Sequence, residues 1–194
     1  MNKAELSVRL ILVFGVFVLT GLLISGCAGR RTWVQIGEYK PQFTKDWIQY
    51  KGKSIYLMNF DNQASDTSIW YYYSRDQKLY YGADSTIHNY FWYAFNDALV
   101  NAGMAVSSVD HPDPTAPAMR VILRSITDER YNVRVTVQKK GTSTLSKDYS
   151  VEETLPAEAD RSPQVMAQRA YSMTNRLIES VLADSPFQKT ITEP

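Results

Sequence analysis

Two stretches of the chain repeat apolar residues at the spacing of an α-helix. The first, over 85–102, repeats Ile87, Phe91, Ala94, Phe95, Ala98, Leu99 and Ala102. The second, from Ser162 to about 183, repeats Met166, Ala170, Met173, Leu177 and Val181. Asp84 or Ser85 can cap the first helix and Gly103 can end it. Ser162 followed by Pro163 is a favourable N-cap and first residue for the second helix.

Strand patterns occupy most of the remaining chain. The apolar run 53–60 predicts a strand that is buried on both faces. In 131–139, Tyr131 and three valines alternate with polar residues, which is typical of an antiparallel sheet with one solvated face. Further strands are expected over 104–109, 119–127 and 145–154. The proline-rich segment 111–117 predicts a loop, 140–142 a hairpin turn, and 61–83 a long irregular stretch.

Counted as four strands, the element order is β-α-β-β-β-α. It predicts an α+β fold, a mostly antiparallel sheet with the helices packed on one face. We expect one such domain over 52–186, followed by a polar tail over 187–194. Residues 27–51 carry isolated aromatic residues without a period. They indicate a tether that lies over the domain and packs a few rings, in preference to a free linker.

The first 26 residues have the pattern of a secretory signal peptide. Lys3 and Arg9 make the start basic, and the 15-residue apolar run 10–24 follows. This run is shorter than the roughly 20 apolar residues that a membrane-spanning helix needs. We therefore expect residues 1–26 to be removed.

The sequence Ile24-Ser25-Gly26-Cys27 resembles the bacterial lipobox. In that family the cysteine sulfur receives diacylglycerol, the chain is cut between the preceding residue and the cysteine, here Gly26 and Cys27, and the new amine is acylated, commonly with palmitate. The resemblance implies a lipoprotein anchored through Cys27. Ala28, in place of Asp, implies by the same resemblance the Gram-negative outer membrane, with the protein facing the periplasm.

Composition argues against several other classes. After cleavage the chain has a formal charge of zero, which does not favour a nucleic-acid partner. One cysteine excludes an intrachain disulfide, and two histidines leave little for a metal cluster. The sequence contains no P-loop, GxSxG or HExxH motif. His88 is expected to be partly buried and His111 exposed. Glu152 and Glu153, as neighbours in a strand, should point to opposite faces. We predict no catalytic residue, no metal and no cofactor.

Aromatic residues are concentrated in one region of the chain. Eleven of the 24 lie between Trp70 and Phe95. By their phase Phe91 and Phe95 belong to the core. The others suit either a docking surface for a protein, lipid or glycan, or a loop that buries its own rings. The candidate interface residues are Trp70, Tyr71, Tyr72, Tyr73, Tyr80, Tyr81, Tyr90, Trp92 and Tyr93.

The order of elements resembles the auxiliary lipoproteins of ABC-type transport systems, and lipoproteins associated with export pores. The resemblance covers Lys53–Phe60, Ser85–Gly103, Met119–Lys139 and Ser162–Ala183. It implies a non-enzymatic accessory component that docks on a larger envelope complex for transport, secretion or surface assembly. Its partners would be envelope proteins, with self-assembly as one form. The alternative is a carrier of a small lipid or glycan that uses the aromatic segment 70–95.

Overall fold

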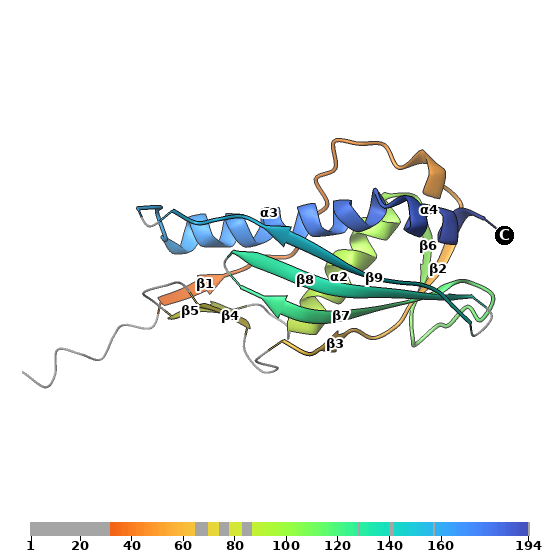
Figure 1. Ribbon diagram of the computed structural model, residues 1–194, viewed down its shortest axis with the longest axis horizontal. Helices are drawn as coiled ribbons and strands as arrows, with labels where there is room; N and C mark the ends of the chain where they lie inside the picture. Colours follow the sequence, from red (N-terminus) through yellow and green to blue (C-terminus); the bar gives the residue numbers. More distant parts are fainter. Residues whose placement is uncertain are drawn as a thin grey trace, which may run out of the picture. The chain divides into compact units, whose positions relative to one another are not determined.

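The computed structural model describes residues 32–64, 70–73, 78–82, 87–127, 129–139, 142–156 and 158–193 (Figure 1). The predicted signal peptide 1–26, the lipobox-like sequence and Cys27 lie outside these residues. So do Asp84 and Ser85, which were predicted to cap a helix, and residues 140–141 of the predicted hairpin turn. Residues from Thr32 onward form one unit, which extends the predicted domain of 52–186 at both ends.

The main sheet has six strands and mixes parallel with antiparallel pairs. Along the sheet β6 (Ala105–Ser107), β2 (Ser54–Leu57), β7 (Ala118–Ile126), β8 (Arg130–Lys139) and β9 (Thr142–Glu152) follow one another. The long pairs β7–β8 and β8–β9 are antiparallel. The short β2 is parallel to both of its neighbours, and β3 (Asp61–Asn62) pairs with β7 in the same direction.

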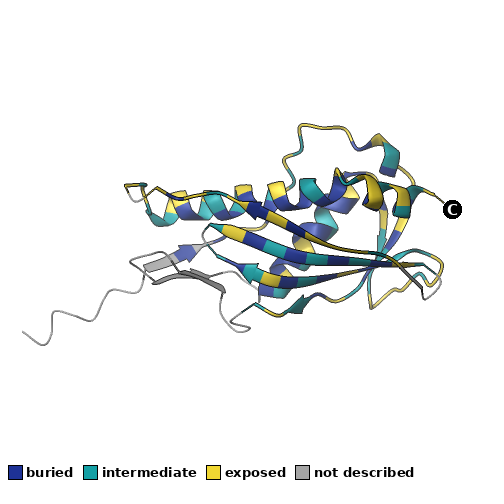
Figure 2. Ribbon diagram, viewed as in Figure 1, coloured by how far each residue is buried: buried dark blue, intermediate teal, exposed yellow. Residues whose placement is uncertain are grey.

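One face of this sheet carries the core. On β8, Tyr131, Val133, Val135 and Val137 are fully buried, while the residues between them are not (Figure 2). Helices α2 (Ile87–Asn101) and α3 (Pro163–Leu182) cover that face, and the rings of Phe91 and Tyr131 meet edge to face at 5.8 Å. The opposite face is polar and bears ion pairs such as Arg134–Asp148 at 2.7 Å. The predicted α+β class and the single helical layer are confirmed.

Several details differ from the sequence-based expectation. Between the two long helices lie four strands, β6 to β9, one for each strand range predicted there, although the predicted order β-α-β-β-β-α counts only three. The stretch 61–83 is not wholly irregular, since it holds β3, β4 (Trp70–Tyr73) and β5 (Lys78–Gly82). With β1 (Thr32–Gln35), β4 and β5 form a separate three-stranded sheet in the order β1-β5-β4.

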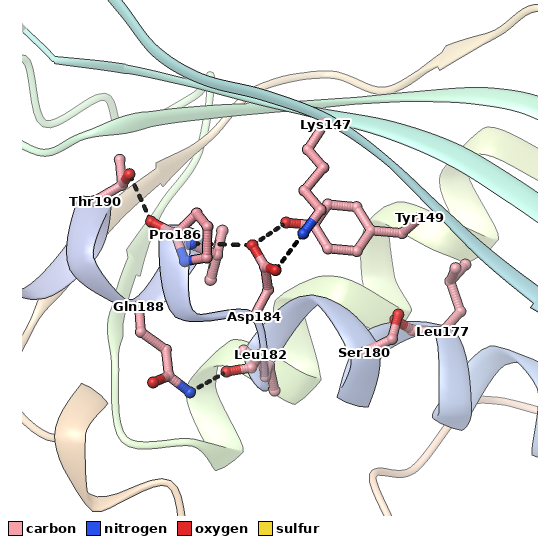
Figure 3. A network of polar contacts seen from close by, with 10 residues as sticks. Lys147, Tyr149, Leu177, Ser180, Leu182, Asp184, Pro186, Gln188 and Thr190 are labelled. Atoms are coloured by element: carbon pink, nitrogen blue, oxygen red, sulfur yellow. Dashed lines mark hydrogen bonds and ion pairs between the residues drawn. The ribbon is translucent and has the colours of Figure 1, made fainter.

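The prediction of a polar tail at 187–194 is wrong for most of that segment. Helix α4 (Ser185–Thr192) follows α3 directly and buries Phe187 and Ile191. Asp184 lies between the two helices, as Figure 3 shows. Its carboxylate accepts hydrogen bonds from the backbone N–H of Phe187 at 3.2 Å and from the Tyr149 hydroxyl at 2.9 Å, and it pairs with Lys147. This network fixes α4 to β9.

The predicted tether packs against the domain from Thr32 onward. Tyr39 and Trp47 are buried, as is Tyr50 of the short 3-10 helix Ile48–Tyr50. The Tyr39 hydroxyl donates to Asn175 Oδ1 at 2.7 Å, and the Tyr50 hydroxyl donates to the Leu182 carbonyl at 2.6 Å. Within residues 32–51, the rings of Tyr39, Trp47 and Tyr50 are thus packed against the domain.

Gly103 ends α2, as predicted. Its φ of +91° lies in the left-handed region that favours glycine, and its carbonyl accepts from the N–H of Gly52 at 2.9 Å. The chain then enters β6 beside β2. Among the described residues no helix is both long and apolar enough to cross a membrane.

Candidate functional site

Strands β2 and β6 and helix α2 form a unit in which two parallel strands flank a crossover. Ser54 pairs with Ala105 and Tyr56 with Ser107, so the carboxyl ends of both strands meet at one edge of the sheet. Such an edge, with the start of the connecting helix beside it, is the usual place for a ligand in parallel sheets. A cavity of about 450 Å³ lies here.

Each of the three elements contributes to the wall of this cavity. Asn59 and Phe60 follow β2, and residues 108–110 follow β6. The first two turns of α2 supply the remainder, His88, Asn89, Trp92 and Tyr93. The volume is within the range of small-molecule sites, roughly 300–1,000 Å³.

The aromatic part of the wall is held in place on one side and open on the other. The Trp92 indole N–H donates to the Met58 carbonyl at 3.1 Å, which fixes the ring. Tyr93 stands at 90° to that ring with a centroid separation of 5.2 Å, and 57% of the tyrosine is exposed. An anchored indole beside an exposed phenol offers a surface on which another molecule can pack.

The polar part of the wall is suited to hydrogen bonding with an uncharged group. Its amides and hydroxyl are those of Asn59, Asn89 and Ser108, and Asp110 adds a carboxylate. Among the described lining residues there is no lysine or arginine that would bind a phosphate. His88 also lines the cavity and is partly buried, as predicted.

The structure separates the nine candidate aromatic residues into three groups. Trp92 and Tyr93 come together at the cavity. Tyr90 was expected at an interface, but that prediction is wrong. It is only 6% exposed, and burial raises its pKa to about 12. Its phase on α2 directs it to the core beside Phe91, with the rings at 5.6 Å. The other six lie on β4 and β5, where their side chains are outside the described residues.

The carboxylates that are neighbours in sequence do not form an acid–base pair. Glu152 binds Arg130 of β8 at 3.1 Å, whereas Glu153 binds Arg169 and Arg176 of α3. Glu129 accepts the N–H of Leu155 at 3.1 Å. His111 is exposed, as expected. Within the described part of the chain, no three acidic, histidine or cysteine residues are placed to hold a metal ion.

A second cavity, of about 360 Å³, lies near the opposite end of β2. There Lys53 donates to the Thr192 carbonyl at 3.1 Å and Lys139 to the Glu193 carbonyl. Lysines at the carboxyl end of a helix satisfy its last carbonyls and complement its dipole. The two lysines at this second cavity are thus explained by their contacts with the end of α4.

Sequence reasoning missed Asn59, Ser108 and Asp110 as cavity residues. They come together only because β2 and β6 are parallel, whereas the sequence predicted a mostly antiparallel sheet. The signal present in the sequence was the order strand, helix, strand over 53–109. That order is the signature of a parallel crossover.

Comparison with known proteins supports the fold. No family model and no curated protein matches the chain. The crystal structure of protein XCC0632 from Xanthomonas campestris, described as belonging to the family DUF330, is similar to it with a TM-score of 0.52. The two share 10% sequence identity, and the match covers 78% of this chain and 95% of that one. A second crystal structure, described only as an uncharacterized protein, has a TM-score of 0.47 and 11% identity over 78% of this chain and 98% of its own. This chain has the α+β fold of the Xanthomonas protein.

Proposed function

We propose that this chain is an outer-membrane lipoprotein, anchored through acylated Cys27 and facing the periplasm. It acts as a non-enzymatic accessory component that docks on a larger envelope complex for transport, secretion or surface assembly. The observation that carries the anchor is the lipobox Ile24-Ser25-Gly26-Cys27, placed directly after a basic start and a short apolar run. The single cysteine of the chain stands at the position that receives the lipid.

The cavity beside Trp92 and Tyr93 supports the docking role. An exposed tyrosine next to a fixed indole, with hydrogen-bonding groups around them, is typical of the centre of a protein interface. Val109, on the rim of the cavity, is 46% exposed and adds apolar area. A partner segment can thus insert an apolar group while its backbone bonds to the amides.

The anchor is tested by metabolic labelling with palmitate and by the size of the product. Wild type should carry label and lose residues 1–26. Cys27→Ala should remain as unlabelled precursor. Ser25→Ala is the matched control, because it keeps a small residue beside the cut and should be processed normally. Normal processing of Cys27→Ala would refute the anchor.

Docking is tested by cross-linking in intact envelopes followed by affinity purification. Tyr93→Ala should reduce recovery of a stoichiometric envelope partner, because it removes the exposed ring of the cavity. Ile48→Ala is the control, since Ile48 is an exposed apolar residue, at 80%, that does not line the cavity. Equal recovery by all three proteins would show that the cavity is not the docking site.

A carrier of a small lipid or glycan is the second candidate function. The cavity of about 450 Å³ is the observation that favours it. Its amide and hydroxyl lining suits a sugar better than an acyl chain, because a chain of CH₂ groups would leave those groups without partners. Native mass spectrometry of the purified protein, together with a glycan-binding screen, should detect the ligand. Absence of both a lipid adduct and glycan binding would eliminate this candidate.

A further inference from the structure

The three-stranded sheet brings together residues that are far apart in the sequence and rich in aromatic rings. In β1, Trp33 stands at the level of Tyr80 of the parallel strand β5. In β4, Trp70 and Tyr71 are paired with Tyr81 and Tyr80. One residue of β1, two of β5 and all four of β4 are tryptophan or tyrosine. In the whole chain aromatic residues make up only 12%.

This sheet begins close to the proposed lipid anchor. Thr32, the first residue of β1, follows Cys27 by five residues. Five residues span at most about 18 Å even when fully extended. Covalent geometry therefore keeps the first residue of β1 within that distance of Cys27, and β5 is the strand paired with β1. In the anchored protein this separation puts the start of the sheet within reach of the membrane surface.

Residue chemistry in and around the sheet matches the headgroup region of a bilayer. Tryptophan and tyrosine accumulate at membrane–water interfaces because each has an apolar body and a polar tip. The segments 28–35 and 70–82 contain four basic residues and one acidic residue, although the mature chain as a whole is neutral. The basic residues are Arg30, Arg31, Arg75 and Lys78. Such an excess is attracted to anionic lipids.

We propose that the β1-β5-β4 sheet rests in the headgroup region of the anchoring membrane and forms a second contact beside the lipid. This inference rests on the proposed acylation of Cys27. An acyl anchor alone does not determine which side of the domain faces the membrane. A second contact five residues away sets which side of the domain faces the membrane.

The four tryptophans of the chain provide a test without foreign labels. Trp33 and Trp70 belong to the sheet, while Trp47 is buried in the domain and Trp92 is fixed at the cavity. Full-length processed lipoprotein is reconstituted into vesicles of phosphatidylethanolamine and phosphatidylglycerol. Part of the lipid carries bromine on the acyl chain near the headgroup, which quenches nearby tryptophan. Wild type should lose emission relative to vesicles without bromine.

The variant Trp33→Phe/Trp70→Phe should lose most of that quenching, because its remaining tryptophans lie in the domain. The matched variant Trp47→Phe/Trp92→Phe should keep it, and far-ultraviolet circular dichroism verifies the fold of both. If the first variant is quenched as strongly as wild type, or wild type is not quenched, the membrane contact is refuted. Palmitate labelling of the same samples separates the two proposals. Labelled protein without quenching overturns only the contact, whereas unlabelled protein overturns the anchor on which it rests.

Discussion

Replacing Asp184 with alanine should remove three interactions at the junction of α3 and α4. The carboxylate caps the first turn of α4 through Phe187 N–H, accepts from the Tyr149 hydroxyl and pairs with Lys147 (Figure 3). The Asp184 side chain is only 11% exposed, so water replaces these partners incompletely. Because α4 buries Phe187 and Ile191, loosening its first turn also weakens that part of the core.

The expected loss in free energy of unfolding is the sum of three contributions. Loss of an N-cap costs about 1 kcal/mol of the free energy of unfolding. A hydrogen bond to a charged group contributes about 1.5 kcal/mol or more. The ion pair adds at most about 0.5 kcal/mol, since the Lys147 side chain is 45% exposed. We therefore expect Asp184→Ala to cost about 2.5–3 kcal/mol, or roughly 5–12 °C in Tm for a domain of this size.

Two further variants separate these contributions. Asp184→Asn keeps the cap, because asparagine is as good an N-cap as aspartate, and should cost about 1 kcal/mol. Lys147→Ala should cost less than about 1 kcal/mol, as a half-exposed pair. Urea unfolding followed by circular dichroism measures all three. If Asp184→Ala unfolds within about 0.5 kcal/mol of wild type, the network does not hold α4.

The Asp184 carboxylate also makes the stability of the fold depend on pH. Burial raises the pKa of Asp184, but hydrogen bonds from Lys147, Tyr149 and Phe187 N–H outweigh it and hold the pKa below 3.8. The ionised form is therefore favoured by folding. Its contribution is complete above the ordinary pKa and is lost as the pH falls below about 3.8 through the folded value. As the pH falls below about 3.8, wild type should lose more stability than Asp184→Ala. Equal losses would show that ionised Asp184 is not the source of the acid sensitivity.

Three other predictions can be tested in the same unfolding assay. Tyr90→Ala truncates a core residue and should lower the free energy of unfolding by about 3–5 kcal/mol, whereas Tyr93→Ala, at an exposed residue, should change it by less than about 0.5 kcal/mol. Similar losses for both variants would contradict the assignment of Tyr90 to the core and Tyr93 to the surface. Gly103→Ala should cost about 1–2 kcal/mol, because φ is +91° and a Cβ there would lie 3.2 Å from Lys51 Cα; an unchanged midpoint would argue against that strain. Burial raises the pKa of five core tyrosines above 10. Their contribution to stability is therefore complete below pH 10 and should be lost as the pH rises further. Phenolate absorbance from these residues before the protein unfolds would disprove this prediction. They are Tyr39, Tyr50, Tyr90, Tyr131 and Tyr149.

The parts of the fold that could be predicted are those where one face of an element is buried. Helices α2 and α3 and strands β7 and β8 each bury one regular set of residues, and the apolar period records it. The run from Trp70 to Tyr73 has no polar alternation, so its strand was missed. Helix α4 was missed because the chain after Pro186 was interpreted as a polar tail, although proline also begins helices.

The candidate site was predictable only in part. The aromatic residues Trp92 and Tyr93 stood out by composition, and both line the cavity. Their partners Asn59 and Asp110 depend on which strands become neighbours, and this is decided by packing between distant segments. The phase of Tyr90 on α2 did indicate its burial, because it lies three positions after Ile87 and four before Ala94, and both of these residues are buried.

The long-range contacts of residues 32–51 bear on when the proposed lipoprotein can be processed during export. Tyr39 and Tyr50 reach their partners Asn175 and Leu182 only across more than 130 residues. In an exported chain the amino-terminal segment emerges first, and such distant contacts form late. If the chain is exported and acylated as we propose, residues 32–51 stay without these partners until the carboxyl-terminal helices have crossed the membrane. In that case Cys27 would meet the acylating and cleaving enzymes while the adjoining segment 32–51 is still unfolded.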